Sequence, residues 1–216
     1  MEPAANFACR SQNRMETLGK IFGSASKVRI MRLFLFNPQL VFDLGSISKK
    51  TKTLLTTAKK EVSNLERTGL IKRKSFVKDY LTRGKLLKKR VPGWVLDEKF
   101  PFLAHLQNFL IEITGAQQAE IVHKIKKIGP IKLLVVSGVF IPEREGRVDL
   151  LIVADKVKKN TIEAIVSDIE SEIGKELKYS VFETSDFMYR IGVCDKLIRD
   201  ILDYPHRKMI NKLELV

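Results

Sequence analysis

The sequence predicts an α/β protein built from two domains, and three observations support this prediction. Apolar residues recur at helical spacing through most of residues 15–67. Two short apolar runs rich in β-branched residues, 131–136 and 148–154, have the length and composition of buried strands in a small mixed sheet. The chain has 216 residues, which suits two domains of about 100 residues each.

The excess of positive charge is confined to the first half of the chain. Residues 1–100 hold 22 Lys and Arg against 8 Asp and Glu, whereas residues 101–216 hold 17 of each kind. The excess is concentrated in residues 49–60 and 71–90. A field of one sign in one half of a protein attracts a polyanion to that half, and neutralised phosphates release counterions. A basic surface that serves solubility alone is the alternative.

The first three expected helices lie within residues 15–50. Runs 15–23 and 26–36 have helical periodicity, and Asn37-Pro38 ends the second run because a residue before proline disfavours helix. Asp43 is a suitable N-cap for a short helix over residues 44–50.

A further helix and a hairpin follow the polar turn 51–53. The helix is expected from Leu54 to about Arg67, with one apolar face made of Leu55, Ala58, Val62 and Leu65. Gly69 supplies the left-handed residue that often follows a helix C-terminus. Strands over residues 70–77 and 91–96, with a turn at Gly84, complete the hairpin.

This order of elements is that of a winged helix-turn-helix, over residues 15–97. The segment Leu65-Glu66-Arg67-Thr68-Gly69-Leu70-Ile71 resembles the end of the recognition helix in winged-helix regulators of the ArsR/MarR kind. The resemblance implies double-stranded DNA as the partner. A winged helix that binds RNA or a protein is an alternative.

The expected DNA-binding residues lie off the apolar face of the last helix and along the hairpin. Their side chains are of the types that reach base edges and phosphates. They are Thr56, Thr57, Lys59, Lys60, Ser63, Asn64, Arg67, Lys72, Arg73, Lys74, Arg83 and Lys85, with Lys88, Lys89 and Arg90 near them on the hairpin. A lysine-rich helix face that is only solvated is the alternative.

The second half is expected to contain a linking helix over residues 98–114 and an α/β domain over residues 115–204. The domain has the order α-β-β-α-β followed by helices. Its expected elements are a helix over 116–127, strands over 131–136 and 148–154, a helix over 157–174, a strand over 177–182, and helical segments over 185–190 and 195–202.

The first two strands of this domain carry a known motif in altered form. The pattern strand, Ser137-Gly138, loop and strand with Asp149 resembles the minimal nucleotidyltransferases of the polymerase-beta type. Members of that family hold two Mg²⁺ ions with two carboxylates one residue apart on the second strand and a third on a later strand. Here Gly138 matches the glycine and Asp149 the second carboxylate. Val139 replaces the serine and Arg147 replaces the first carboxylate.

These departures imply a retained fold without transferase chemistry. The strand over 177–182 has no acid in its middle, and one carboxylate cannot hold two Mg²⁺ ions. The resemblance leaves a vestigial nucleotide pocket made of Ser137, Gly138, Arg147 and Asp149, in which Arg147 and Lys132 are candidates to hold an anion. A surface role for Arg147 and a structural role for Asp149 are the alternatives.

The sequence therefore predicts a cytoplasmic DNA-binding transcriptional regulator. Its second domain would form a homodimer or sense a small molecule or nucleotide. We expect no catalytic residue, cofactor or metal site, because Cys9 and Cys194 are the only cysteines and the three histidines lie in separate segments. No apolar run has the ~20 residues that a membrane span needs. The alternative from the enzyme class is an active nucleotidyltransferase that its basic domain delivers to nucleic acid.

Overall fold

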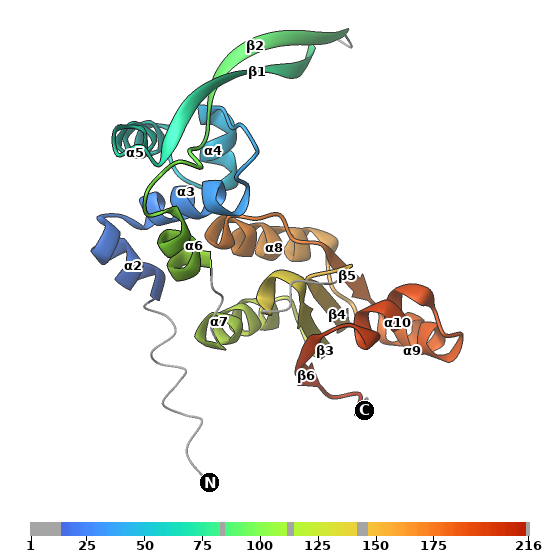
Figure 1. The fold of residues 1–216 in the computed structure, drawn as a ribbon. Coiled ribbons are helices and arrows are strands. Elements are labelled where there is room, and N and C mark those ends of the chain that lie inside the picture. Colours follow the sequence, from blue (N-terminus) through green and yellow to red (C-terminus); the bar gives the residue numbers. More distant parts are fainter. Residues whose placement is uncertain (1–13, 83–84, 112–114, 142–146, 215–216) are drawn as a thin grey trace. The chain divides into compact units, whose positions relative to one another are not determined.

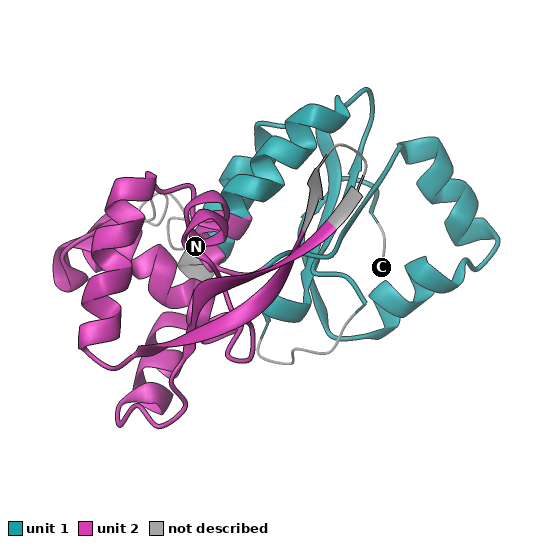
Figure 2. Cartoon of the chain, turned by 90° about the horizontal axis from the view of Figure 1, so that it is seen from above, with its two compact units in different colours: residues 1–12, 112–169, 176–216 teal, residues 13–111, 170–175 magenta. Residues whose placement is uncertain are grey.

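The computed structural model describes residues 14–82, 85–111, 115–141 and 147–214 (Figure 1). The protein is of the α/β class, as predicted. It divides into two compact units, coloured separately in Figure 2. We call residues 13–111 with 170–175 the helical unit, and residues 1–12, 112–169 and 176–216 the sheet unit. None of the helices in the described ranges has the length and apolar character of a membrane span.

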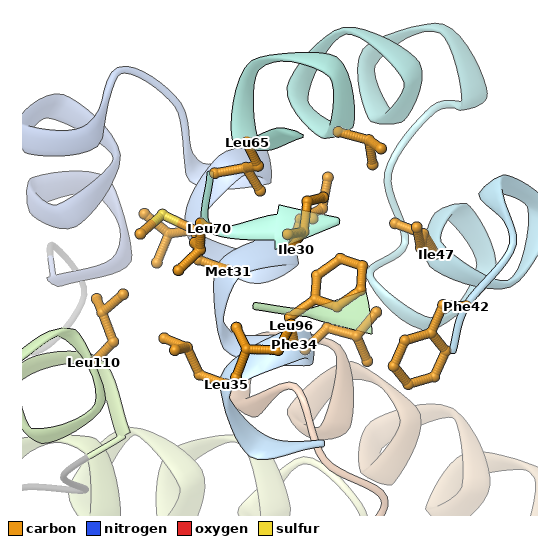
Figure 3. Packing of buried hydrophobic residues seen from close by; sticks show 14 of the residues in the cluster. Ile30, Met31, Phe34, Leu35, Phe42, Ile47, Leu65, Leu70, Leu96 and Leu110 are labelled. Atoms are coloured by element: carbon orange, nitrogen blue, oxygen red, sulfur yellow. The ribbon is translucent and has the colours of Figure 1, made fainter. Parts of the chain in front are cut away.

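The helical unit has the predicted order of helices and hairpin. Its elements are α2 (Arg14–Phe22), α3 (Ala25–Phe36), α4 (Leu44–Lys50), α5 (Leu55–Arg67), β1 (Ile71–Thr82), β2 (Lys85–Leu96) and α6 (Leu103–Ile111). Helix α3 is the centre of this unit, because almost every residue from Val28 to Leu35 is buried. Figure 3 shows its apolar side chains packed against those of the surrounding elements, which include Ile47, Leu65, Leu70, Leu96 and Leu110.

Local hydrogen bonds define the helix ends at the residues that the sequence indicated. The side chain of Asp43 accepts a bond from the backbone N–H of Ser46, which confirms it as the N-cap of α4. Gly69 follows α5 with a φ of +80°. Its N–H donates to the carbonyl of Glu66, and the N–H of Leu70 donates to the carbonyl of Leu65. These two bonds form a Schellman motif, so the chain leaves α5 directly into β1.

The hairpin is longer than predicted. Strands β1 and β2 pair without interruption from Ile71 with Leu96 to Thr82 with Lys85. Twelve residues per strand correspond to roughly 40 Å of ribbon. The prediction stopped early because six of the thirteen residues 78–90 are Lys or Arg, and the segment lacks the apolar alternation of a half-buried strand. At its base the hairpin gains a third strand segment, since Phe42 and Trp94 exchange two backbone hydrogen bonds of 2.9 Å.

The sheet unit contains a four-stranded mixed sheet. Its strands are β3 (Ile131–Ser137), β4 (Leu150–Ala154), β5 (Tyr179–Phe182) and β6 (His206–Asn211), in the order β5-β4-β3-β6. Strand β3 is antiparallel to both of its neighbours, whereas β4 and β5 are parallel. The edge strand β6 was not predicted, because its sequence, His-Arg-Lys-Met-Ile-Asn, has no clear alternation of apolar and polar residues.

Helices cover both faces of this sheet (Figure 1). They are α7 (Gly115–Lys126), α8 (Lys159–Ile173), α9 (Thr184–Gly192) and α10 (Lys196–Asp203). Leu133, Val135, Leu151 and Val153 form one face, which packs against Phe187 of α9 and against Ile198 and Ile201 of α10. Leu134, Val136, Leu150 and Ile152 form the other face and are also fully buried.

Candidate nucleic-acid interface

Helix α5 presents a polar stripe on the side opposite its buried face. Ala58, Val62 and Leu65 are buried in the core. Of the seven residues predicted on this helix, five are exposed: Thr56, Lys59, Lys60, Ser63 and Arg67. Thr57 and Asn64 are half-buried. Among the described residues, neither Lys59 nor Lys60 has a carboxylate partner, so both charges remain available to an external anion.

A tight turn holds α5 in place relative to α4. The hydroxyl of Thr51 donates to the carbonyl of Ile47 at 2.7 Å, and the hydroxyl of Ser48 donates to the carbonyl of Thr53 at 2.7 Å. The N–H of Thr53 returns a bond to the carbonyl of Ser48. Further along α5, the carboxylate of Glu61 accepts a bond of 2.7 Å from the hydroxyl of Ser24, the N-cap of α3. These bonds fix the direction of the exposed stripe.

Asn64 is already engaged within its own helix. Its side-chain oxygen accepts a 2.5 Å bond from Arg67 Nη2, and its Nδ2 lies 3.4 Å from Glu61 Oε2. The sequence predicted Asn64 as an exposed residue that pairs with base edges. In this arrangement Asn64 orients Arg67, and it would have to release that guanidinium before it could contact a base.

Glu66 of α5 bonds both strands at the base of the hairpin. Its carboxylate accepts a bond of 3.0 Å from Trp94 Nε1 and forms a 2.7 Å ion pair with Arg73 Nε. The hydrogen bond from Trp94 and the bond from Arg73 lower the pKa of Glu66 below its usual value. Arg73 and Trp94 are register partners on β1 and β2, so one carboxylate holds both strands. Arg73, a predicted DNA contact, is therefore paired although its side chain is 74% exposed.

Two further hairpin lysines have carboxylate partners. Lys72 pairs with Asp97 at 3.0 Å. Lys78 pairs with Asp43 at 2.6 Å and also contacts the hydroxyl of Ser46. Burial raises the pKa of Asp43, but its bonds with Lys78 and Ser46 outweigh that effect and lower it overall. Lys78 thus links β1 to the N-cap of α4, a contact between residues 35 positions apart that no local sequence pattern indicates.

The remaining hairpin cations that the structure describes carry no such partner. They are Lys74, Lys88, Lys89 and Arg90, and all four side chains are exposed. Arg83 lies outside the described residues, as does the side chain of Lys85. All three of these ion pairs are made by cations of β1, and the described cations of the returning strand β2 have no carboxylate partner among the described residues.

Leu54 and Leu55 were not recognised as functional candidates. Leu55 shares a side of α5 with Ala58, Val62 and Leu65, as its spacing indicates, but Leu55 is 54% exposed and Leu54 is 77% exposed. The buried face of the helix begins only at Ala58. Helical periodicity predicts which residues share a side of the helix. It does not predict how far along the helix axis that side is covered by neighbouring elements.

In the sheet unit, the predicted motif residues Ser137, Gly138 and Asp149 do come together. Asp149 is 7% exposed, and its two carboxylate oxygens accept bonds of 2.8 and 2.9 Å from the N–H groups of Val139 and Lys178. Gly138 has a φ of +54°, and a Cβ there would overlap Asp149 Oδ1. The hydroxyl of Ser137 donates to the carbonyl of Val148. This geometry favours the structural role for Asp149.

The two cations of the expected anion site are both paired with carboxylates. Arg147 Nε lies 2.8 Å from Asp200 Oδ2, and Lys132 Nζ lies 2.8 Å from Asp155 Oδ2. The bond from Lys132, together with bonds from the N–H and hydroxyl of Thr184, lowers the pKa of Asp155 to about 2. Within the described ranges, no group of three or more His, Cys, Asp or Glu side chains is placed to hold a metal ion.

Comparison of the chain with family models, curated proteins and solved structures finds no match. Functional assignment therefore depends on the geometry of the two units.

Proposed function

We propose that this protein is a DNA-binding transcriptional regulator that holds duplex DNA with α5 and the β1–β2 hairpin. The observation that supports this most strongly is the distribution of unpaired cations. Lys59 and Lys60 on α5, and Lys74, Lys88, Lys89 and Arg90 on the hairpin, are exposed and have no carboxylate partner among the described residues. Unpaired cations of this kind contribute most to the affinity for DNA, because each one that contacts a phosphate releases a condensed counterion.

The shape of the two elements suits a duplex. Helix α5 has 13 residues and is therefore about 20 Å long. The major groove, about 12 Å wide, admits one helix, and the threonine, serine, lysine and arginine side chains of α5 are types that contact bases and phosphates. The hairpin leaves directly from the end of α5 and is tied to it by Glu66. Helix α5 and the base of the hairpin would therefore contact the duplex with a fixed orientation relative to each other.

For the sheet unit we propose a role in dimerisation or in sensing a ligand, without transferase chemistry. Both carboxylate oxygens of Asp149 already accept hydrogen bonds from backbone N–H groups. Arg147 stands where a metal-binding carboxylate would be needed. The cytoplasm is the compartment we propose, since the two cysteines of the chain, Cys9 and Cys194, lie far apart in the sequence and do not suggest a disulfide framework.

The salt dependence of binding tests the proposed function. If α5 and the hairpin together make about 6–8 phosphate contacts, log K against log salt concentration should have a slope of about −5 to −7 for the full-length chain on duplex DNA. Substituting Lys59→Ala together with Lys60→Ala should weaken binding and make the slope less steep by about 2. Fluorescence anisotropy with a labelled duplex measures both quantities.

A matched control separates a specific surface from general basicity. Lys126 and Lys127 are exposed lysines of the sheet unit, and the double variant Lys126→Ala, Lys127→Ala changes the net charge by the same amount. We expect this control to bind DNA as the unsubstituted protein does. An equal loss in both double variants, a flat salt response, or tighter binding to RNA than to duplex DNA would contradict the proposal.

A further inference from the structure

The first turn of α5 exposes two adjacent leucines. Leu54 is 77% and Leu55 is 54% exposed, whereas Ala58, Val62 and Leu65 on the same helix are 0–2% exposed. Isolated exposed apolar residues are common on protein surfaces. Two neighbouring leucines at the beginning of the helix that bears the polar stripe form a small apolar patch, and they add little to the core of the unit.

The positive charge around this patch restricts the kind of partner that can cover it. Residues 44–60 contain five lysines and no acidic residue. Lys49 and Lys52 are exposed before the leucines, and Lys59 and Lys60 are exposed after them. A partner that covers the leucines must therefore offer apolar groups beside negative charge. Duplex DNA meets both conditions, because the C5-methyl group of thymine projects into the major groove between the phosphate backbones.

We propose that Leu54 and Leu55 contact thymine methyl groups and contribute to the sequence specificity of this protein. This inference rests on the DNA-binding function proposed above. In helix-turn-helix proteins the N-terminal residues of the recognition helix contact base edges. Leu54 and Leu55 hold that place in α5, next to the exposed Thr56. Asn64 lies near the other end of the helix and is engaged by Arg67, so it is the weaker candidate for base contact.

Replacing thymine with uracil tests the inference, because it removes the methyl group and leaves base pairing intact. Duplexes bound by the full-length chain are first selected from a random pool, and each dT of the selected site is then replaced in turn by dU. We expect one or more replacements to weaken binding about 4-fold each, which corresponds to about 0.8 kcal/mol for one buried methyl-sized group. Replacements outside the contacted positions should have no effect.

The variant Leu54→Ala, Leu55→Ala should bind the dT and dU duplexes equally. It should retain the salt dependence of binding to unselected DNA, since the lysines are unchanged. Leu40→Ala is a matched control, because Leu40 is a 53% exposed leucine of the same unit that lies outside α5. This control should discriminate dT from dU as the unsubstituted protein does. Circular dichroism verifies that both variants remain folded.

The outcomes separate this inference from the proposed function. Salt-dependent binding to duplex DNA with equal affinity for dT and dU sites overturns the role of the leucines and leaves the proposed function standing. If the variant Leu54→Ala, Leu55→Ala still binds dT duplexes more tightly than dU duplexes, the proposed role of the leucines is overturned as well. A loss of self-association in that variant, measured by analytical ultracentrifugation, with discrimination intact, assigns the leucines to a protein contact instead. Absence of any duplex binding overturns both proposals.

Discussion

Gly138 and Asp149 depend on each other for their positions. The positive φ of Gly138 disfavours any residue with a Cβ, and the space that a Cβ would need is occupied by Asp149 Oδ1. Asp149 in turn accepts hydrogen bonds from the backbone at Val139 and at Lys178. The glycine and the aspartate that resemble a nucleotide site thus form a structural joint between β3, β4 and the segment that precedes β5.

The substitution Gly138→Ala should destabilise the sheet unit. We expect a loss of about 2–4 kcal/mol in the free energy of unfolding, since it adds left-handed backbone strain and displaces a buried, hydrogen-bonded carboxylate. Urea denaturation followed by circular dichroism measures it. Gly192→Ala is the control, because nothing lies within 4 Å of a Cβ at that position, which is the last residue of α9. Equal effects of the two substitutions would argue against the joint.

Asp155 should make the stability of the sheet unit depend on pH in acid. Its pKa is lowered from 3.8 to about 2, chiefly by the bond from Lys132 and then by those from Thr184. The folded protein therefore binds fewer protons here than the unfolded chain, so this contribution is complete above pH 4 and is lost as the pH falls towards 2. The stability difference between the unsubstituted protein and Asp155→Asn should shrink over that interval. A difference that is independent of pH would contradict this account.

Residues whose role is set by local geometry could be predicted, and those that depend on distant partners could not. Asp43 and Gly69 each bond a backbone group three residues away, so their capping roles follow from the sequence. The engagement of Asn64 depends on the rotamer of Arg67, and the pair Lys78–Asp43 depends on the path of a hairpin. The same holds for Arg147, whose partner Asp200 lies 53 residues further along the chain.

At the scale of elements, the hairpin is the part of the structure that departs most from its prediction. The apolar residues near its base, such as Ile71 and Leu96, belong to the core and were recognised as strands. The outer part was not. Asp79 and residues 87–90 have exposed side chains, and a strand exposed to solvent has no reason to alternate apolar and polar residues. Edge strand β6 was missed for a related reason, since its side chains are only partly buried or exposed.

The returning strand of the hairpin should supply a separate part of DNA affinity. Substituting Lys88, Lys89 and Arg90 together with alanine removes three exposed charges that lack a partner among the described residues. The slope of log K against log salt should become less steep by about 2–3, at about 0.9 for each phosphate that is no longer neutralised. The triple variant Lys126→Ala, Lys127→Ala, Lys158→Ala, on exposed lysines of the sheet unit, is the charge-matched control. An unchanged slope in the hairpin variant would show that this strand does not reach the phosphates.

At the scale of the whole molecule, the excess of positive charge lies in the first half of the chain, and the motif that resembles a nucleotide site lies in the second half. The excess of Lys and Arg belongs to residues 1–100, and the later residues have no net charge. Composition and the order of elements were sufficient to predict the α/β class. They were insufficient for the motif at Ser137-Gly138, where the same residue types suit a nucleotide site and a hydrogen-bonded joint. Only the placement of Asp149 against two backbone N–H groups distinguishes these possibilities.

We expect this protein to transfer no nucleotides. Two divalent ions that flank a triphosphate need several converging carboxylates, and the described part of the sheet unit provides Asp149, whose oxygens are already bonded, beside the cation Arg147. Incubation of the full-length protein with labelled nucleotides, Mg²⁺ or Mn²⁺, and RNA or protein acceptors should give no incorporation above that of Asp149→Ala. Because this substitution leaves the N–H groups of the buried Val139 and of Lys178 without an acceptor, its folded state must be verified by circular dichroism. Incorporation by the unsubstituted protein that is abolished in a folded Asp149→Ala variant would establish the enzymatic alternative.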